Sequence, residues 1–85
     1  MVVELEIFKK KLLYRASYRG TKEMDILLSG FVKKYINNFD MAQLLELEKF
    51  LELEDETILN FYNFNISDNR IDKNSISPIF KNYKI

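Results

Sequence analysis

The sequence predicts an all-α fold, a small single-domain bundle of about five short helices. In several successive stretches apolar residues recur at the spacing of one helix face. No stretch alternates apolar and polar residues between hairpin turns, as half-buried strands would. The chain has 85 residues, of which 47% are hydrophobic, enough for one domain with a modest core. We therefore expect residues 1–85 to fold as one unit.

The first two predicted helices meet at Gly20. The first runs from Glu4 to Ser17 and carries an apolar stripe, and Gly20 is expected to end it by taking a positive φ. Thr21 then caps a second helix that reaches about Ile36. The apolar residues of the two helices are Leu5, Phe8 and Leu12 in the first and Met24, Leu27, Leu28, Phe31 and Tyr35 in the second.

Capping patterns define the remaining helices. Asp40, followed three residues later by Gln43, is a capping-box pattern that begins a third helix. The acidic run 54–56 ends that helix and suits the N-terminus of a short fourth one. Segment 63–75 is rich in Asn, Ser and charges and is expected to be the least ordered part. Ser77-Pro78 then predicts the N-cap and first turn of a final helix.

The residue types present exclude most catalytic chemistry. The chain contains no Cys and no His, which removes disulfides, thiolate nucleophiles, imidazole acid–base catalysis and ordinary zinc sites. Glu23 and Asp25 lie two positions apart on one helix, so their carboxylates do not converge. Neither glycine belongs to a phosphate-binding loop motif. We expect a binding protein that is not an enzyme and has no metal site.

The charges are balanced overall but separated along the chain. Basic residues predominate in residues 8–35 and acidic residues in 40–56, while the net charge is zero and the pI is about 6.3. Such asymmetry fits a partner surface, and it equally fits solvated helix faces that pair within the domain. A nucleic-acid-binding domain would use Lys9–Lys11, Arg15, Arg19 and Lys22 against phosphates. The zero net charge argues against it.

Location is predicted from what the sequence lacks. No run of about 18 apolar residues is present to span a membrane. The first residues have neither the basic start of a signal peptide nor the Arg-rich character of a transit peptide. We therefore expect a cytoplasmic, bacterial protein that does not insert into membranes.

Charged and aromatic residues gather around Gly20. Arg19 and Glu23 stand four positions apart and suit either a local ion pair, worth only about 0.5 kcal/mol, or contact with a partner protein. Tyr14 and Tyr18 suit either partial burial with the hydroxyl at the surface or partner contact. The residues alone leave both choices open.

This junction carries a family resemblance. Arg19-Gly20-x-x-Glu23, followed by Met24-Asp25 and a leucine-rich helix, resembles the RGxxE signature of the succinate dehydrogenase assembly (flavinylation) factors, the SdhE type of bacteria and assembly factor 2 of mitochondria. The resemblance covers residues 10–61 and includes a second similar stretch, Leu51-Glu52-x-Glu54-Asp55-x-x-Ile58-Leu59-x-Phe61. Tyr18 stands where many members have arginine, and Phe61 where most have tryptophan. The glycine that often follows the tryptophan is missing.

The resemblance implies a function. Members are small five-helix proteins that bind the flavoprotein subunit of succinate dehydrogenase, and in some bacteria of fumarate reductase, and promote covalent attachment of FAD to a histidine of that subunit. FAD would belong to the partner, and this chain, a monomer when free, would hold no cofactor of its own. Arg19, Gly20 and Glu23 would face the flavoprotein near its flavin, with Arg15 and Asp25 as supports. The alternative is a small helical adaptor with an unrelated partner.

Overall fold

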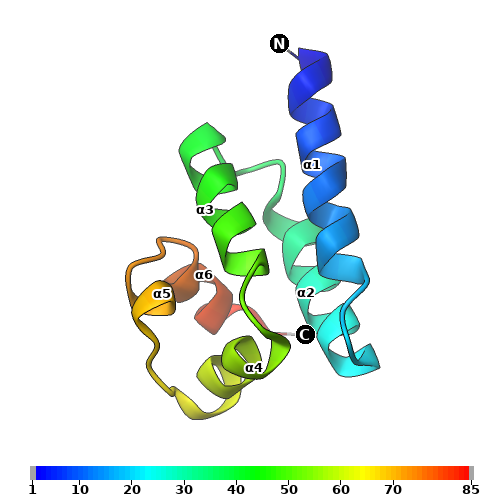
Figure 1. The fold of residues 1–85 in the computed structure, drawn as a ribbon. Helices are drawn as coiled ribbons and strands as arrows, with labels where there is room; N and C mark the ends of the chain where they lie inside the picture. Colours follow the sequence, from blue (N-terminus) through cyan, green and yellow to red (C-terminus); the bar gives the residue numbers. More distant parts are fainter. Residues whose placement is uncertain (1, 85) are drawn as a thin grey trace.

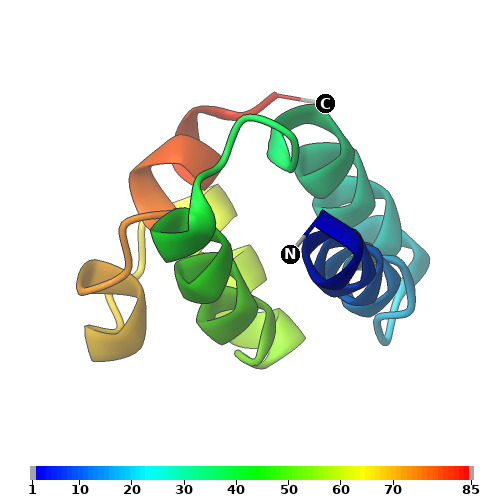
Figure 2. The same ribbon diagram turned by 90° about the horizontal axis from the view of Figure 1, so that it is seen from above.

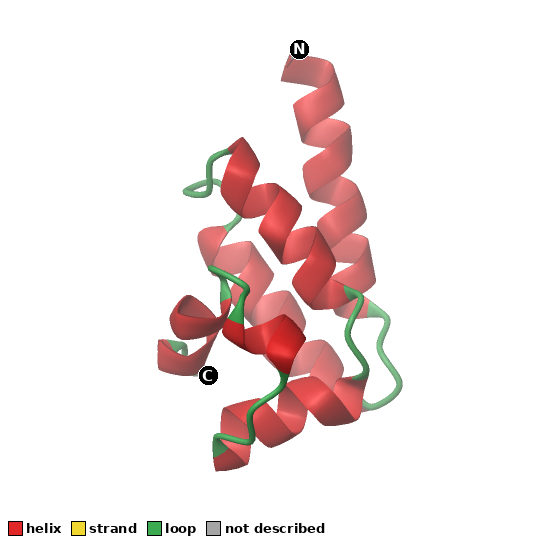
Figure 3. Ribbon diagram, turned by 60° about the vertical axis from the view of Figure 1, so that its left-hand side comes forward, coloured by secondary structure: helices red, strands yellow, loops and turns green. Residues whose placement is uncertain are grey.

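The computed structural model describes residues 2–84, and within them the chain forms six helices and no strand (Figures 1 and 3). The helices are α1 (Val2–Ser17), α2 (Lys22–Tyr35), α3 (Met41–Leu51), α4 (Asp55–Phe64), α5 (Asn69–Asp72) and α6 (Ser77–Asn82). The predicted all-α class is confirmed. The helix that the sequence did not predict is the four-residue α5.

The helices surround one core. α1 and α2 run antiparallel, α1 also packs against α3, and α4 packs against α6 (Figures 1 and 2). The N-terminal turns of α1 extend beyond the other helices (Figures 1 and 3). The link between α1 and α2 and the link between α3 and α4 lie side by side (Figure 3).

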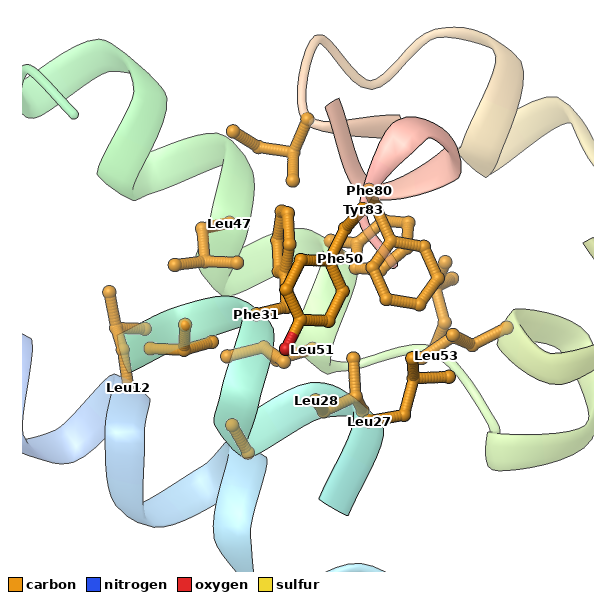
Figure 4. Packing of buried hydrophobic residues seen from close by; sticks show 14 of the residues in the cluster. Leu12, Leu27, Leu28, Phe31, Leu47, Phe50, Leu51, Leu53, Phe80 and Tyr83 are labelled. Carbon is orange, nitrogen blue, oxygen red and sulfur yellow. The ribbon is translucent and has the colours of Figure 1, made fainter. Parts of the chain in front are cut away.

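Aromatic rings from three helices form the centre of the core (Figure 4). The ring of Phe80 lies 5.1 Å from that of Phe31 and 5.1 Å from that of Phe50, centroid to centroid. All three side chains are fully buried. Since burial of such a side chain stabilises a fold by about 1.5–3 kcal/mol, this cluster ties the short α6 to α2 and α3.

Gly30 allows the residue after α6 to reach α2. A Cβ at this position would clash with the hydroxyl oxygen of Tyr83. The Tyr83 ring also packs edge-on against Phe31, with 5.6 Å between centroids. Glycine therefore lets Tyr83 approach α2 without a shift of its hydroxyl group.

Two of the predicted caps are confirmed. The Thr21 Oγ1 accepts the N–H of Met24 at 3.2 Å. Asp40 and Gln43 form both bonds of a capping box, at 2.8 and 3.0 Å. These side chains satisfy backbone donors that the first helical turn leaves unpaired.

The predicted cap at Ser77 is wrong. Ile76 is the N-cap residue, and Ser77 is the first residue of α6, with Pro78 in the same turn. The buried Ser77 hydroxyl donates instead to the carbonyl oxygen of Ile71, at 2.7 Å. A long-range partner therefore replaces the local capping bond.

Segment 63–75 is better ordered than its composition indicates. Ile71 of α5 is fully buried, and Asn74 is 6% exposed. The Asn74 amide donates to the carbonyl of Glu46 at 2.8 Å and its oxygen accepts the N–H of Ile76 at 2.8 Å. Asn65, with φ 58°, takes the left-handed conformation that ends α4. One apolar anchor and one buried amide thus hold a polar segment on the core.

Candidate partner-binding site

Gly20 makes a close contact, and its backbone angle is an ordinary one. No glycine among the described residues has a positive φ, so the expected left-handed helix stop is wrong. α1 ends earlier, at Ser17. The Gly20 N–H donates to Oδ2 of Asp55 at 2.8 Å, and a Cβ on residue 20 would lie 3.0 Å from that oxygen. A side chain here would push the carboxylate away.

The guanidinium of Arg19 is directed into the molecule. Its Nε donates to Oδ1 of Asp55 at 2.7 Å, Nη1 to the carbonyl of Leu51 at 2.7 Å and Nη2 to the carbonyl of Leu53 at 2.8 Å. The Arg19 side chain is only 10% exposed. The two carbonyls lie at and just after the C-terminus of α3, where helices leave acceptors unpaired and favour positive charge.

Asp25 holds the same turn from the other side. Its Oδ1 accepts the backbone N–H of Arg19. We call Arg19, Gly20, Asp25 and Asp55, with the carbonyls of Leu51 and Leu53, the junction network. It joins the α1–α2 link to the α3–α4 link, which run side by side in Figure 3.

Glu23 lies beside this network but outside it. It is in the first turn of α2, its side chain is exposed, and it forms no hydrogen bond or ion pair with any of residues 2–84. The local Arg19–Glu23 ion pair is absent, because the Arg19 guanidinium bonds to Asp55 instead. Glu23 is a carboxylate that a partner can reach.

Arg15 faces α3. Its Nη1 lies 3.6 Å from Oε2 of Glu48, and its side chain is 41% exposed. The structure thus brings Arg19, Gly20 and Asp25 together and leaves Arg15 outside their network. The pairs Arg15–Glu48 and Arg19–Asp55 also show that part of the charge separation along the sequence is neutralised within the domain.

Tyr14 and Tyr18 form an exposed aromatic pair at the end of α1. Their side chains are 64% and 71% exposed, and their ring centroids are 4.5 Å apart. Of the two interpretations left open, partial burial does not describe them. Large exposed aromatic side chains next to a held turn are typical of protein interfaces.

Asp55 is the network residue that the sequence reasoning missed. The acidic run 54–56 was assigned to the N-terminus of the fourth helix, and α4 does begin at Asp55. Its carboxylate, however, bonds to Arg19 and Gly20 of the α1–α2 link. Asp55 belongs to the stretch from Leu51 to Phe61 that also resembles the family, and this was the one signal that could have found it. Nothing in the residue spacing indicated a partner 36 residues away.

A second charged cluster surrounds Arg70. Its guanidinium donates to Glu54 at 3.2 Å and to Asp68 at 3.1 Å. The pKa of Glu54 is held below its usual value by its own backbone N–H and by Arg70, and the pKa of Asp68 by its hydrogen bonds to Arg70. These groups lie at the surface, so the cluster adds little to stability.

A hollow of about 440 Å³ lies next to this cluster, between α3 and α5. Its lining includes the bases Lys49, Arg70 and Lys73 and the acids Glu46 and Glu52. This mixture of signs selects no ligand of one charge. No group of acidic residues in the described chain is arranged to hold a metal ion, and none of its helices is long and apolar enough to cross a membrane.

Comparison with protein families identifies the chain. Residues 10–82 match the family model described as flavinator of succinate dehydrogenase. The chain belongs to this family. The match covers the whole junction network and all of α2 to α6, so the resemblance seen in the Arg19-Gly20-x-x-Glu23 motif is confirmed.

Relatives within the flavinator family come from yeast, insects and bacteria. The chain is 43% identical over 51 residues to succinate dehydrogenase assembly factor 2, mitochondrial, of Scheffersomyces stipitis, covering 60% of this chain and 34% of that protein. It is 40% identical over 47 residues to assembly factor 2-B of Drosophila ananassae, covering 55% and 29%. It is 34% identical over 53 residues to the FAD assembly factor SdhE of Acetobacter pasteurianus, covering 62% and 49%. The aligned parts thus span less than half of each of these relatives, and no solved structure is significantly similar to the chain.

Proposed function

We propose that this protein is an assembly factor that binds the flavoprotein subunit of succinate dehydrogenase and promotes covalent attachment of FAD to it. The observation that carries the proposal is the family match over a chain whose RGxxE motif forms a held, solvent-accessible turn. Relatives named for succinate dehydrogenase assembly and for FAD assembly support it.

The proposed action is binding without catalysis. The chain offers no Cys thiol and no His imidazole for joining a flavin to a protein, and in this proposal the new bond forms between the flavin and the partner's own residues. FAD stays with the flavoprotein. The factor raises the yield by binding more tightly to the subunit conformation that reacts, which increases the population of that conformation.

The exposed groups around the junction supply the proposed contacts. The Glu23 carboxylate can accept charge-assisted hydrogen bonds from a partner arginine or from backbone N–H groups. The Tyr14–Tyr18 pair offers an apolar and partly polar surface next to it. Arg19 is bonded internally and is not available to phosphates, which argues further against a nucleic-acid-binding role.

The proposal extends to the setting of the protein. The free chain acts as a monomer in the bacterial cytoplasm, where it meets the flavoprotein subunit before that subunit joins its complex. The flavoprotein subunit of fumarate reductase is a second candidate partner. Both partners can be tested in the same assay.

The test is flavin fluorescence of the denatured flavoprotein subunit in a gel, after expression with and without this chain. We expect covalent flavin to depend on the wild-type chain and to fall several-fold with Glu23→Gln. Glu4→Gln, which removes an exposed carboxylate from the first turn of α1, is the matched control and should have no effect. Equal fluorescence in every lane would overturn the proposal and favour a helical adaptor with another partner.

A further inference from the structure

We infer that Asp55 is a positioning residue of the partner-binding site. It acts by fixing Arg19 and Gly20 so that the turn presents Glu23 to the flavoprotein. The inference rests on the proposed function, and it assigns the arginine and glycine of the motif an internal role. Glu23 is then the motif side chain that meets the partner.

Both oxygens of the Asp55 carboxylate are used by the α1–α2 link. Oδ1 accepts Nε–H of Arg19 at 2.7 Å, and Oδ2 accepts the N–H of Gly20 at 2.8 Å. One carboxylate thus fixes a side chain and the adjacent backbone together. Hydrogen bonds of this charge-assisted kind are shorter and stronger than neutral ones, so they define the geometry of the turn.

Releasing Arg19 to a partner would be costly. Its guanidinium also supplies the carbonyls of Leu51 and Leu53, and its side chain is 90% shielded from solvent. Withdrawal would leave two backbone carbonyls and Oδ1 of Asp55 without their donors in a partly buried place. The geometry therefore favours an arginine that stays where it is when the partner binds.

The position of Glu23 depends on the same network. Asp25, two residues further along the first turn of α2, accepts the backbone N–H of Arg19. The start of α2 is thereby tied to the turn that Asp55 holds. A change at Asp55 should therefore move Glu23, although the two carboxylates share no hydrogen-bond partner.

The decisive variant is Asp55→Asn in the 85-residue chain. Whichever way the amide is turned, its NH₂ group faces one of the two N–H donors, so at least one bond is lost together with the charge. Binding of the purified flavoprotein subunit is then measured by calorimetry. We expect the dissociation constant to rise by at least tenfold, since Glu23 is no longer held in place.

The opposite result would identify a direct role for Arg19. If the guanidinium contacts the partner, Asp55→Asn frees it, and binding should be unchanged or tighter. That outcome would overturn the inference. Arg19→Gln weakens binding under both hypotheses and therefore does not separate them.

A double-mutant cycle separates positioning from simple loss of stability. If Asp55 acts through Glu23, Glu23→Gln should weaken binding several-fold in the wild-type background and hardly at all in the Asp55→Asn background. Additive effects would contradict the inference. Ser77→Ala is the control for stability, because it removes a buried hydrogen bond outside the network and should leave the dissociation constant unchanged at temperatures where the chain is folded.

Amide hydrogen exchange tests the network without any partner. The Gly20 N–H should exchange faster in Asp55→Ala, which removes both acceptor oxygens, than in the wild type, while the core amide of Phe31 keeps its protection. Unchanged Gly20 exchange would overturn the inference. If the wild-type chain does not bind the flavoprotein, the proposed function fails, and the exchange experiment still decides whether Asp55 holds the turn.

Discussion

Asp55 and Gly20 lie 35 residues apart in the sequence, yet Oδ2 of Asp55 accepts the Gly20 N–H at 2.8 Å and would lie 3.0 Å from a Cβ on that residue. Glycine thus suits this position because the Asp55 carboxylate leaves little room for a side chain. Its backbone angle would allow other residues, since no glycine of the described chain has a positive φ. The cost of substituting it should therefore depend on residue 55.

Gly20→Ala should lower the melting temperature by several degrees, corresponding to about 1 kcal/mol, because the carboxylate must move by a few tenths of an ångström. In the Asp55→Ala background the same change should cost much less, since the methyl group then has no carboxylate to displace. Thermal unfolding followed by circular dichroism measures both differences. Equal costs in the two backgrounds would show that Gly20 is required for another reason.

The effect of Gly30→Ala on the free energy of unfolding should change sign with the residue at position 83. With Tyr83 in place the new Cβ clashes with the tyrosine hydroxyl oxygen, so we expect destabilisation by about 1–3 kcal/mol. With Tyr83→Phe the nearest remaining atom is the ring Cζ, at 3.6 Å, which is an ordinary contact. Alanine should then stabilise α2 by up to about 1 kcal/mol through its higher helix propensity.

Urea unfolding of the wild type, Gly30→Ala, Tyr83→Phe and the double variant measures this change of sign. Tyr83→Phe alone is the reference for the second pair, because it also changes the surroundings of Phe31. Destabilisation by Gly30→Ala in both backgrounds would mean that the glycine serves the packing of the ring and not only of the hydroxyl.

The sequence predicted those helices and caps that depend on interactions between residues close together in the chain. The periodicity of Leu27, Leu28 and Phe31 and the capping box of Asp40 and Gln43 depend on neighbours within a few residues. α5 was missed because one buried residue, Ile71, and the long-range amide of Asn74 hold it. Such contacts leave no periodic trace.

The sequence indicated which residues gather at the candidate site, but not which of their side chains face inward. The motif identified the junction around Arg19, and the structure joins Arg19, Gly20 and Asp25 there. Which side chain faces inward was not predictable, because it depends on Asp55, which folding brings from the start of α4. The partner-binding roles of Arg15, Arg19, Gly20, Glu23 and Asp25 follow from the family resemblance, and all five stay predictions.

Asn74 should be the most sensitive polar residue of the C-terminal segment. Asn74→Ala removes the bond to the carbonyl of Glu46 and leaves the N–H of Ile76 without a partner, next to a side chain that is 6% exposed. We expect a loss of about 1–3 kcal/mol in the free energy of unfolding. Asn82→Ala, at an exposed position of α6, is the matched control and should change it by less than about 0.5 kcal/mol. Equal effects measured by urea unfolding would contradict the role assigned to the Asn74 amide.

The Arg70 cluster predicts a stability difference that disappears in acid. The pKa values of Glu54 and Asp68 lie below their ordinary 4.5 and 3.8 in the folded chain. A depressed carboxyl pKa stabilises the fold above the ordinary value, and this contribution is lost as the pH falls through the lowered one. The wild type should therefore melt slightly higher than Arg70→Gln at pH 7, with a constant gap down to about pH 5 that closes below about pH 4. Lys73→Gln, an exposed base beside the same hollow, should show a flatter profile. A gap that widens in acid would contradict the prediction, because protonated carboxyl groups no longer attract the guanidinium.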